Sequence, residues 1–352
     1  MPAWKAHCLV LLATLAGLLG IGYAAALVVD PYDAIRYSPP LDRLPLADRR
    51  RFTLPAVARN PRFDSLILGT STTMLLRPEQ LDSLFDARFA NLAMPSATPY
   101  EQLRLLGLFA RDRDQFRNLI VGVDGAWCNT DRAPDFLGRQ GAAGFPDWIY
   151  DDIPWNDFPV PNTRLVTDTV QQAAILLGRR QYATRADGYF EFPTWRYGRY
   201  DAAKVARKLH GAELAHYRNI PASIVSGRRR EPESWVFGDV QKLRSALSEL
   251  PSETRKLLYL VPYHINILPE GKSPAGQAWA SCKAALASIG EQVENLYVVD
   301  FMLPGDLTGT DSNYWDPLHY TLAVARDLAI LLRQAVAVPE QAVADYRVLA
   351  AP

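Results

Sequence analysis

The stretch Ser65-Leu66-Ile67-Leu68-Gly69-Thr70-Ser71 places a glycine and then a serine directly after a short apolar run. An apolar run of this length that stops at turn residues is typical of a buried strand. In an open parallel sheet, ligands bind beyond the carboxyl ends of the strands. The stretch therefore predicts a strand over 65–70 that delivers Ser71 to the functional edge of a sheet.

The same alternation of strand and helix continues on both sides of a long interruption. Strands that alternate with helices indicate an α/β fold with a parallel sheet. The expected strands after the first are 89–93, 118–124, 256–262 and 296–301, and the expected helices are 78–85, 100–111, 236–250, 275–289 and 319–335.

The amino terminus predicts a membrane segment. Lys5 precedes an uncharged, mostly apolar run from Cys8 to Val29, which is long enough to cross a hydrocarbon core as a helix. Ala24-Ala25-Ala26 would suit a signal-peptide cleavage site, but the run continues past it, so an uncleaved anchor is favoured. The positive end is expected to stay in the cytoplasm, which leaves the rest of the chain outside it.

Composition narrows the classes of function. The 38 basic and 38 acidic side chains balance, so nothing attracts the chain to nucleic acid. No group of Cys and His has metal-ligand spacing, and no cofactor is expected. Outside the membrane segment only Cys128 and Cys282 remain, either as a disulfide or as two buried thiols.

The interruption between the two α/β halves is rich in aromatic residues, proline and arginine. It is interpreted as a lid or a substrate-binding subdomain, with helical pieces at 166–177 and 202–210. Arg228-Arg229-Arg230 is interpreted as a solvated turn. The expected organisation is an anchor or signal (1–30), a connector (31–60), an α/β core (61–124 and 236–338), the insertion (125–235), and a surface or weakly ordered tail (339–352).

Three residues predict nucleophilic chemistry. A serine hydroxyl becomes a nucleophile when a base takes its proton and a carboxylate orients that base. Asp316 and His319 are three residues apart in the loop before the last helix, so they can meet at hydrogen-bond distance. Ser71 lies at the carboxyl edge of the same sheet, so we expect all three side chains to converge there.

These motifs resemble the SGNH (GDSL-like) hydrolase superfamily. Gly69-Thr70-Ser71 stands where that family has Gly-Asp-Ser, and Asp316-Pro317-Leu318-His319 matches its Asp-x-x-His block. The segments Asp30-Pro31-Tyr32 and 91–101 are similar to the membrane-anchored periplasmic branch, which includes alginate O-acetylation proteins and DltD-like D-alanyl transfer proteins. The resemblance implies a three-layer α/β/α fold and covers roughly 60–125 and 236–335, but not the insertion.

The resemblance also implies an oxyanion hole. Its donors would be the backbone N–H groups of Ser71 and Ser96, with Ser96 in the place of the family's glycine. The family's asparagine after the third strand is replaced by Asp124, whose charge would repel an oxyanion. Asn129 is the candidate for the missing donor, and the simplest interpretation of Asp124 is a strand-end residue that caps the following turn. Losing one donor typically costs ~3 kcal/mol of transition-state stabilisation.

Three further side chains are candidates for substrate contact. His264 and Tyr263 follow the expected fourth strand at the same rim as Ser71, and Trp127 follows the third. Aromatic faces stack on sugar rings, so the aromatic insertion is the candidate polymer-binding surface.

The resemblance implies O-acyl transfer, chiefly of acetyl, to an extracytoplasmic polysaccharide. Its expected partners are that polysaccharide and a membrane-bound acyltransferase that supplies the acyl group, and its expected location is the bacterial inner membrane with the soluble part in the periplasm. A periplasmic carbohydrate esterase and a catalytically inactive scaffold of a polysaccharide assembly are the alternatives.

Overall fold

The computed structural model describes residues 3–111, 113, 115–130, 144–153, 155–180, 184–192, 200–225 and 235–352. The chain divides into two compact units, one of Met1–Val57 with Pro146–Ala186 and one of Ala58–Phe145 with Asp187–Pro352. This division splits the expected 125–235 insertion between the two units. Arg228-Arg229-Arg230 lies outside the described residues.

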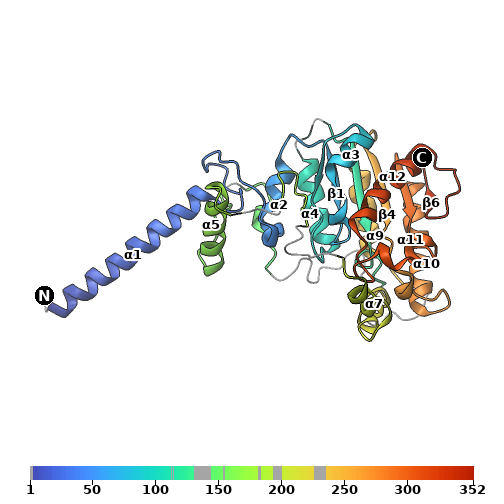
Figure 1. The fold of residues 1–352 in the computed structure, drawn as a ribbon. Helices are drawn as coiled ribbons and strands as arrows, with labels where there is room; N and C mark the ends of the chain where they lie inside the picture. Colours follow the sequence, from blue (N-terminus) through green and yellow to red (C-terminus); the bar gives the residue numbers. More distant parts are fainter. Residues whose placement is uncertain are drawn as a thin grey trace. The chain divides into compact units, whose positions relative to one another are not determined.

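The second unit contains a six-stranded sheet in the order β2-β1-β3-β4-β5-β6. Strands β1, β4 and β6 of this sheet are labelled in Figure 1. The first five strands are parallel and only β6 is antiparallel, which confirms the predicted α/β class with a largely parallel sheet. Their bounds are β1 Ser65–Leu68, β2 Phe89–Asn91, β3 Asn118–Val123, β4 Arg255–Leu260, β5 Leu296–Asp300 and β6 Arg347–Ala350.

Helices cover both faces of the sheet. The chain runs outward from β1 to β2 and then returns past β1 to β3, and right-handed crossovers therefore put the connecting helices on opposite faces. The packing agrees, because α3 packs on α12, whereas α4 packs on α9 and α9 on α10. These helices span α3 Pro78–Phe85, α4 Pro99–Ala110, α9 Gly238–Ser248, α10 Pro274–Gly290 and α12 Leu322–Ala337.

Local signals explain where the helices begin. Thr98 and Glu101 form a capping box at the start of α4, in which each side chain accepts a hydrogen bond from the other residue's backbone N–H. Thr321 caps α12 by accepting from the N–H of Val324. The strand order reverses between β1 and β3, and ligand sites in open α/β sheets usually lie beyond the carboxyl ends of the strands at such a point.

The tail 339–352, predicted as surface or weakly ordered, lies at the surface except for Tyr346, but part of it forms a strand. Residues 347–350 form β6, which pairs with the outer edge of β5, and Tyr346 is buried against Phe301 with ring centroids 5.4 Å apart. The strand was missed because it is short and follows a polar turn, so no period is visible. Pairing satisfies backbone groups that an open β5 edge would leave exposed.

Cys128 and Cys282 form a disulfide that ties the segment after β3 to α10 across 154 positions of sequence. The sequence left open whether these two cysteines form a disulfide or remain buried thiols, and the structure has the disulfide. Cys8, in the N-terminal helix, is free and exposed.

The first unit is built around the N-terminal helix α1, Ala3–Val29, which is long and apolar enough to cross a membrane. Its carboxyl end is integrated into the fold: the Asp30 carboxylate accepts from the N–H groups of Ala34 and Ile35, and Arg43 donates to the carbonyls of Val28 and Val29. Helix α5, Thr163–Leu176, packs on α1.

The expected connector 31–60 is more ordered than its sequence indicates. It contains the short helix η1, Ala47–Arg49, and helix α2, Arg50–Arg59, which tolerates Pro55. Tyr32 and Leu54 are buried. Near the sheet, helices α7, Ala202–His210, and α8, Leu214–Ala222, pack against each other.

Candidate active site

The turn after β1, residues 69–76 and hereafter the nucleophile turn, is shaped by two glycines. Gly69 has a φ of 151°, and a Cβ at Gly69 or at Gly122 of β3 would overlap the Thr73 side chain. The Tyr259 hydroxyl donates to Thr73 Oγ1 at 3.1 Å. Thr73 therefore fills a notch that exists only because both positions lack a side chain, and Ser71 projects from the turn that this fit immobilises.

Asn91 holds the same turn from the side of β2. Its buried side-chain amide donates to the carbonyls of Thr73, Met74 and Leu76 at 3.2, 3.4 and 2.8 Å. Sequence reasoning missed Asn91 as a site residue, because a lone asparagine at a strand end has no motif. It was visible only as a polar residue inside an expected buried strand, which requires a partner.

The loop 314–320, hereafter the acid–base loop, precedes α12. Tyr314 and Tyr320 form an isolated antiparallel bridge, and the N–H of Trp315 donates to the carbonyl of His319 at 2.8 Å. Within this loop Asp316 Oδ1 accepts from the N–H groups of both Leu318 and His319, each at 3.0 Å. The Asp316 carboxylate thus stabilises the conformation of its own loop in addition to binding the imidazole.

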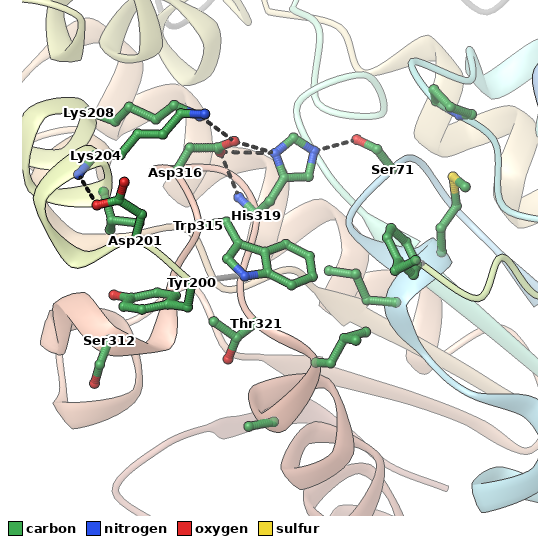
Figure 2. Close-up of a pocket in the computed structure, with 17 residues that line it drawn as sticks. Ser71, Tyr200, Asp201, Lys204, Lys208, Ser312, Trp315, Asp316, His319 and Thr321 are labelled. Atoms are coloured by element: carbon green, nitrogen blue, oxygen red, sulfur yellow. Dashed lines mark hydrogen bonds and ion pairs between the residues drawn. The ribbon is translucent and has the colours of Figure 1, made fainter. Parts of the chain in front are cut away.

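The two segments bring the predicted nucleophile, base and acid together. Ser71 Oγ lies 2.7 Å from His319 Nε2, and His319 Nδ1 lies 2.9 and 3.1 Å from the two oxygens of Asp316 (Figure 2). This is the serine–imidazole–carboxylate order in which the carboxylate orients the base and the base takes the serine proton. Residues 248 positions apart meet as the sequence predicts.

All three side chains open into one cavity of about 820 Å³. Three aromatic residues share its wall with a mixture of aliphatic and polar side chains, as Figure 2 shows. The remaining wall residues are Met74, Leu75, Pro95, Phe192, Tyr200, Asp201, Lys204, Val205, Lys208, Ser312, Trp315, Thr321, Leu322 and Ala323.

Charges in the cavity favour an ionised Asp316. Burial raises the pKa of Asp316, but the hydrogen bond and charge of His319, the N–H of Leu318 and the Lys208 ammonium together lower it below its usual value. Lys208 Nζ lies 3.8 Å from Asp316 Oδ2. An ionised carboxylate can stabilise the imidazolium that forms when His319 takes the serine proton.

Only one of the predicted oxyanion donors lies at the cavity wall. Within the described ranges the N–H of Ser71 meets no hydrogen-bond acceptor, so it is available to a ligand. Ser96 has the positive φ of 51° that a glycine would favour, but its neighbour Pro95, and not Ser96, lines the cavity. Asn129 does not line the cavity either.

Asp124 and Thr70, two of the three residues that differ from the SGNH motifs, are hydrogen-bonded to each other. Thr70 Oγ1 donates to Asp124 Oδ2 at 2.5 Å, and Asp124 Oδ1 accepts from the N–H of Ala126 at 3.0 Å. Burial raises the pKa of Asp124, against the opposing effect of the Thr70 hydrogen bond. The Asp124 carboxyl is buried in these contacts and does not line the cavity, so the expected repulsion of an oxyanion does not follow from its position.

The three predicted substrate contacts are buried instead. Trp127 and Tyr263 are core residues, and neither lines the cavity. The N–H of His264 donates to the carbonyl of Pro317, and its Nε2 lies 3.3 Å from an oxygen of Asp311. Burial lowers the pKa of His264. His264 therefore stabilises the acid–base loop through the Pro317 carbonyl and is not part of the cavity wall.

Other residues at the cavity were not predicted. Trp315 precedes Asp316 directly, and that adjacency was the available signal. Lys208 lies on α7, and Tyr200 lies just before that helix. Both belong to the expected insertion 125–235, and no sequence feature links them to Ser71. Among the described residues no group of Cys, His, Asp and Glu could hold a metal ion.

No known family model matches this chain, and no curated protein matches it. The fold and site alone therefore define its class. It is an α/β protein with a hydrogen-bonded Ser–His–Asp arrangement at the carboxyl edge of a largely parallel sheet.

Proposed function

We propose that this protein is a membrane-anchored serine acyltransferase of the SGNH type, which transfers an acyl group, chiefly acetyl, to an extracytoplasmic polysaccharide. The single observation that carries the proposal is the chain of contacts from Ser71 through His319 to Asp316 in an open cavity. Such a chain activates a hydroxyl for covalent catalysis.

The proposed reaction has two halves. Ser71 Oγ attacks the donor's ester carbonyl while His319 Nε2 takes its proton, and His319 then returns that proton to the leaving oxygen. The product is an ester of Ser71. An acceptor hydroxyl next gives its proton to His319 and attacks the ester. The bond between the acyl carbon and Ser71 Oγ then breaks, and His319 returns the proton to Ser71 Oγ, which transfers the acyl group and restores the free serine. The N–H of Ser71 donates to the oxyanion in both halves.

The cavity wall supports a sugar acceptor. Trp315, Tyr200 and Phe192 offer aromatic faces near Ser71, and aromatic faces pack on the apolar faces of sugar rings. Transfer to water, as in a carbohydrate esterase, uses the same three residues and is the second candidate, because the site is open to solvent. A half-exposed Ser71 is consistent with either acceptor.

The proposed location is the bacterial inner membrane, with the second unit and the part of the first unit that follows α1 on the periplasmic side. Helix α1 would be retained as the anchor, since Asp30 and Arg43 build its carboxyl end into the first unit. The disulfide between Cys128 and Cys282 supports an oxidising compartment. No acyl-coenzyme A is available there, so a membrane-bound acyltransferase is the proposed source of the acyl group.

The test compares Ser71→Ala with Ser312→Ala, a second serine of the same cavity wall, in the full-length protein. A fluorophosphonate probe should label the parent and Ser312→Ala but not Ser71→Ala, and turnover of a chromogenic acetyl ester should follow the same pattern. Equal labelling and turnover in all three proteins would refute the role of Ser71.

A second measurement separates the candidate functions. Acetyl found on an added oligosaccharide supports transfer, and release of acetate alone supports the esterase. If cells that carry Ser71→Ala still acylate their polymer fully, the protein is a scaffold.

A further inference from the structure

The first compact unit has an apolar surface that its own fold does not cover. On α5 and directly after it, Val166, Val170 and Leu177 are 63%, 65% and 67% exposed. The opposite face of α5 buries Asp168 and Gln172 together with Leu165. A helix on a water-soluble protein usually buries its apolar stripe, whereas α5 buries two polar residues and leaves these three apolar side chains exposed. We call Val166, Val170 and Leu177 the outer stripe of α5.

The buried polar face is fully used inside the unit. Asp168 receives hydrogen bonds from the Tyr32 hydroxyl at 2.9 Å and from Arg49 Nε at 2.8 Å. Tyr32 packs on Phe52 with ring centroids 4.9 Å apart. These contacts determine which side of α5 faces the interior of the unit. The outer stripe, on the other side of the helix, is therefore exposed.

The segment before α5 adds four exposed apolar side chains. Ile153, Trp155, Phe158 and Val160 are 51%, 74%, 43% and 73% exposed. We call these four residues the exposed apolar loop residues. Tryptophan is enriched where proteins meet the headgroup level of a bilayer.

A hydrogen bond to α1 locates this surface relative to the membrane span. The Tyr23 hydroxyl donates to the carbonyl of Pro159 at 3.2 Å, and α5 packs on α1. Helix α1 has 27 residues, whereas about 20 residues cross the hydrocarbon core. A span that begins after Lys5 therefore ends near Tyr23, which puts Pro159 and its apolar neighbours at the edge of the hydrocarbon.

We propose that the outer stripe of α5 and the exposed apolar loop residues insert into the headgroup–acyl boundary of the non-cytoplasmic leaflet, beside α1. The occupant is phospholipid. The surface adjoins α1, since α5 packs on α1 and Tyr23 is hydrogen-bonded to Pro159. Its exposed Trp155 and Phe158 are residue types found on the buried side of segments that lie in the membrane interface. The exposed cations Arg164, Arg179 and Arg180 flank it, where they can reach lipid phosphates. This inference rests on α1 as a membrane span and is independent of the chemistry of Ser71.

Spin labels on the full-length protein test the proposal. In a Cys8→Ser background, which leaves the disulfide in place, single cysteines replace Val170 or Trp155, and Ile330 on α12 serves as an equally apolar control that is 48% exposed. The protein is placed in nanodiscs of phosphatidylethanolamine and phosphatidylglycerol. We compare how often each spin label collides with oxygen, which concentrates in the bilayer, and with a nickel complex, which stays in water. The ratio of the oxygen to the nickel collision rate should be several-fold higher for labels at positions 170 and 155 than for a label at position 330. Equal ratios at the three positions would overturn the proposal.

Two further measurements identify the occupant. The double variant Val166→Glu/Val170→Glu should lower the ratio at Trp155 several-fold, while far-ultraviolet circular dichroism and thermal unfolding show that the fold is kept. An unchanged ratio would count against insertion. A photo-crosslinker at Val170 in native membranes should capture lipid. Capture of a protein would show that a partner covers this face and would overturn the assignment to phospholipid.

Discussion

The nucleophile turn and the acid–base loop meet at Ser71 and His319, but different interactions hold them. The nucleophile turn is held by steric fit and neutral hydrogen bonds: Thr73 fills the notch over Gly69 and Gly122, and Asn91 binds three carbonyls. The acid–base loop is held by ionisable groups, with Asp316 bonded to its own loop and close to Lys208.

The two carboxyl groups beside these segments show what that difference does. Asp124 is buried, whereas Asp316 is partly buried in the cavity wall. Burial raises the pKa of both carboxyls, but His319, Leu318 and Lys208 together lower that of Asp316 below its usual value. A buried carboxyl with only neutral partners is held as part of the scaffold. The same group next to an imidazole and an ammonium is ready to stabilise positive charge in a reaction.

Asp316→Asn is expected to have the largest effect on this contrast. The amide cannot hold His319 in the reactive tautomer or stabilise its cation, so ester turnover should fall by about 10⁴-fold, as in comparable sites. Asp124→Asn is the matched control and should keep turnover within a few-fold. Steady-state kinetics of both variants measure the effect, and equal losses would show that the two carboxyls do not differ in role.

Gly122→Ala should disturb the nucleophile turn, which is held by steric fit and not by ionisable groups. The added methyl overlaps the Thr73 side chain, and overpacking of this kind costs about 1–3 kcal/mol of stability. Turnover should fall too, because the displaced turn carries Ser71. Denaturant unfolding of Gly122→Ala, Thr73→Ala and the double variant checks this, and costs that simply add would show that Thr73 is not the obstacle.

Asp124→Asn should remove the pH dependence that Asp124 contributes to stability. Since its folded pKa lies above the ordinary 3.8, its favourable contribution is complete below 3.8 and is lost as the pH rises through the raised pKa. The variant should therefore become more stable than the parent on going from pH 4 to neutral pH. Asp316 has the opposite sign, because its contribution is lost as the pH falls through its lowered pKa. Thermal unfolding across this range tests both signs, and parallel curves for parent and Asp124→Asn would contradict the first.

Lys208→Met should have the smallest effect. Its ammonium is 3.8 Å from Asp316 and partly exposed, and such pairs contribute about 0.2–1 kcal/mol. Turnover should therefore fall less than about tenfold, and added salt should lower the parent's turnover toward that of the variant. Lys204→Met, on the same helix and cavity wall, is the control. If Lys208→Met and Lys204→Met change turnover and its salt dependence equally, Lys208 has no specific role.

Part of this architecture was readable from the sequence alone. Each parallel strand is a short apolar run that ends at a turn residue, so the strands were found within about two residues. Ser71 and the pair Asp316 and His319 were predictable because each follows a strand or precedes a helix at the same edge. Strand β6 was not predictable, because an edge strand of four residues has no period of its own.

The sequence by itself therefore determined which segments become strands and helices, the apolar span of α1, and the convergence of Ser71, Asp316 and His319. Only the tertiary structure decided that Asp124 bonds to Thr70, that Trp127, Tyr263 and His264 point away from the cavity, and that α5 exposes its apolar side. Periodicity along the chain reports which backbone segments are buried. The direction of a side chain at a strand end depends on partners far away in sequence, and no local pattern encodes them.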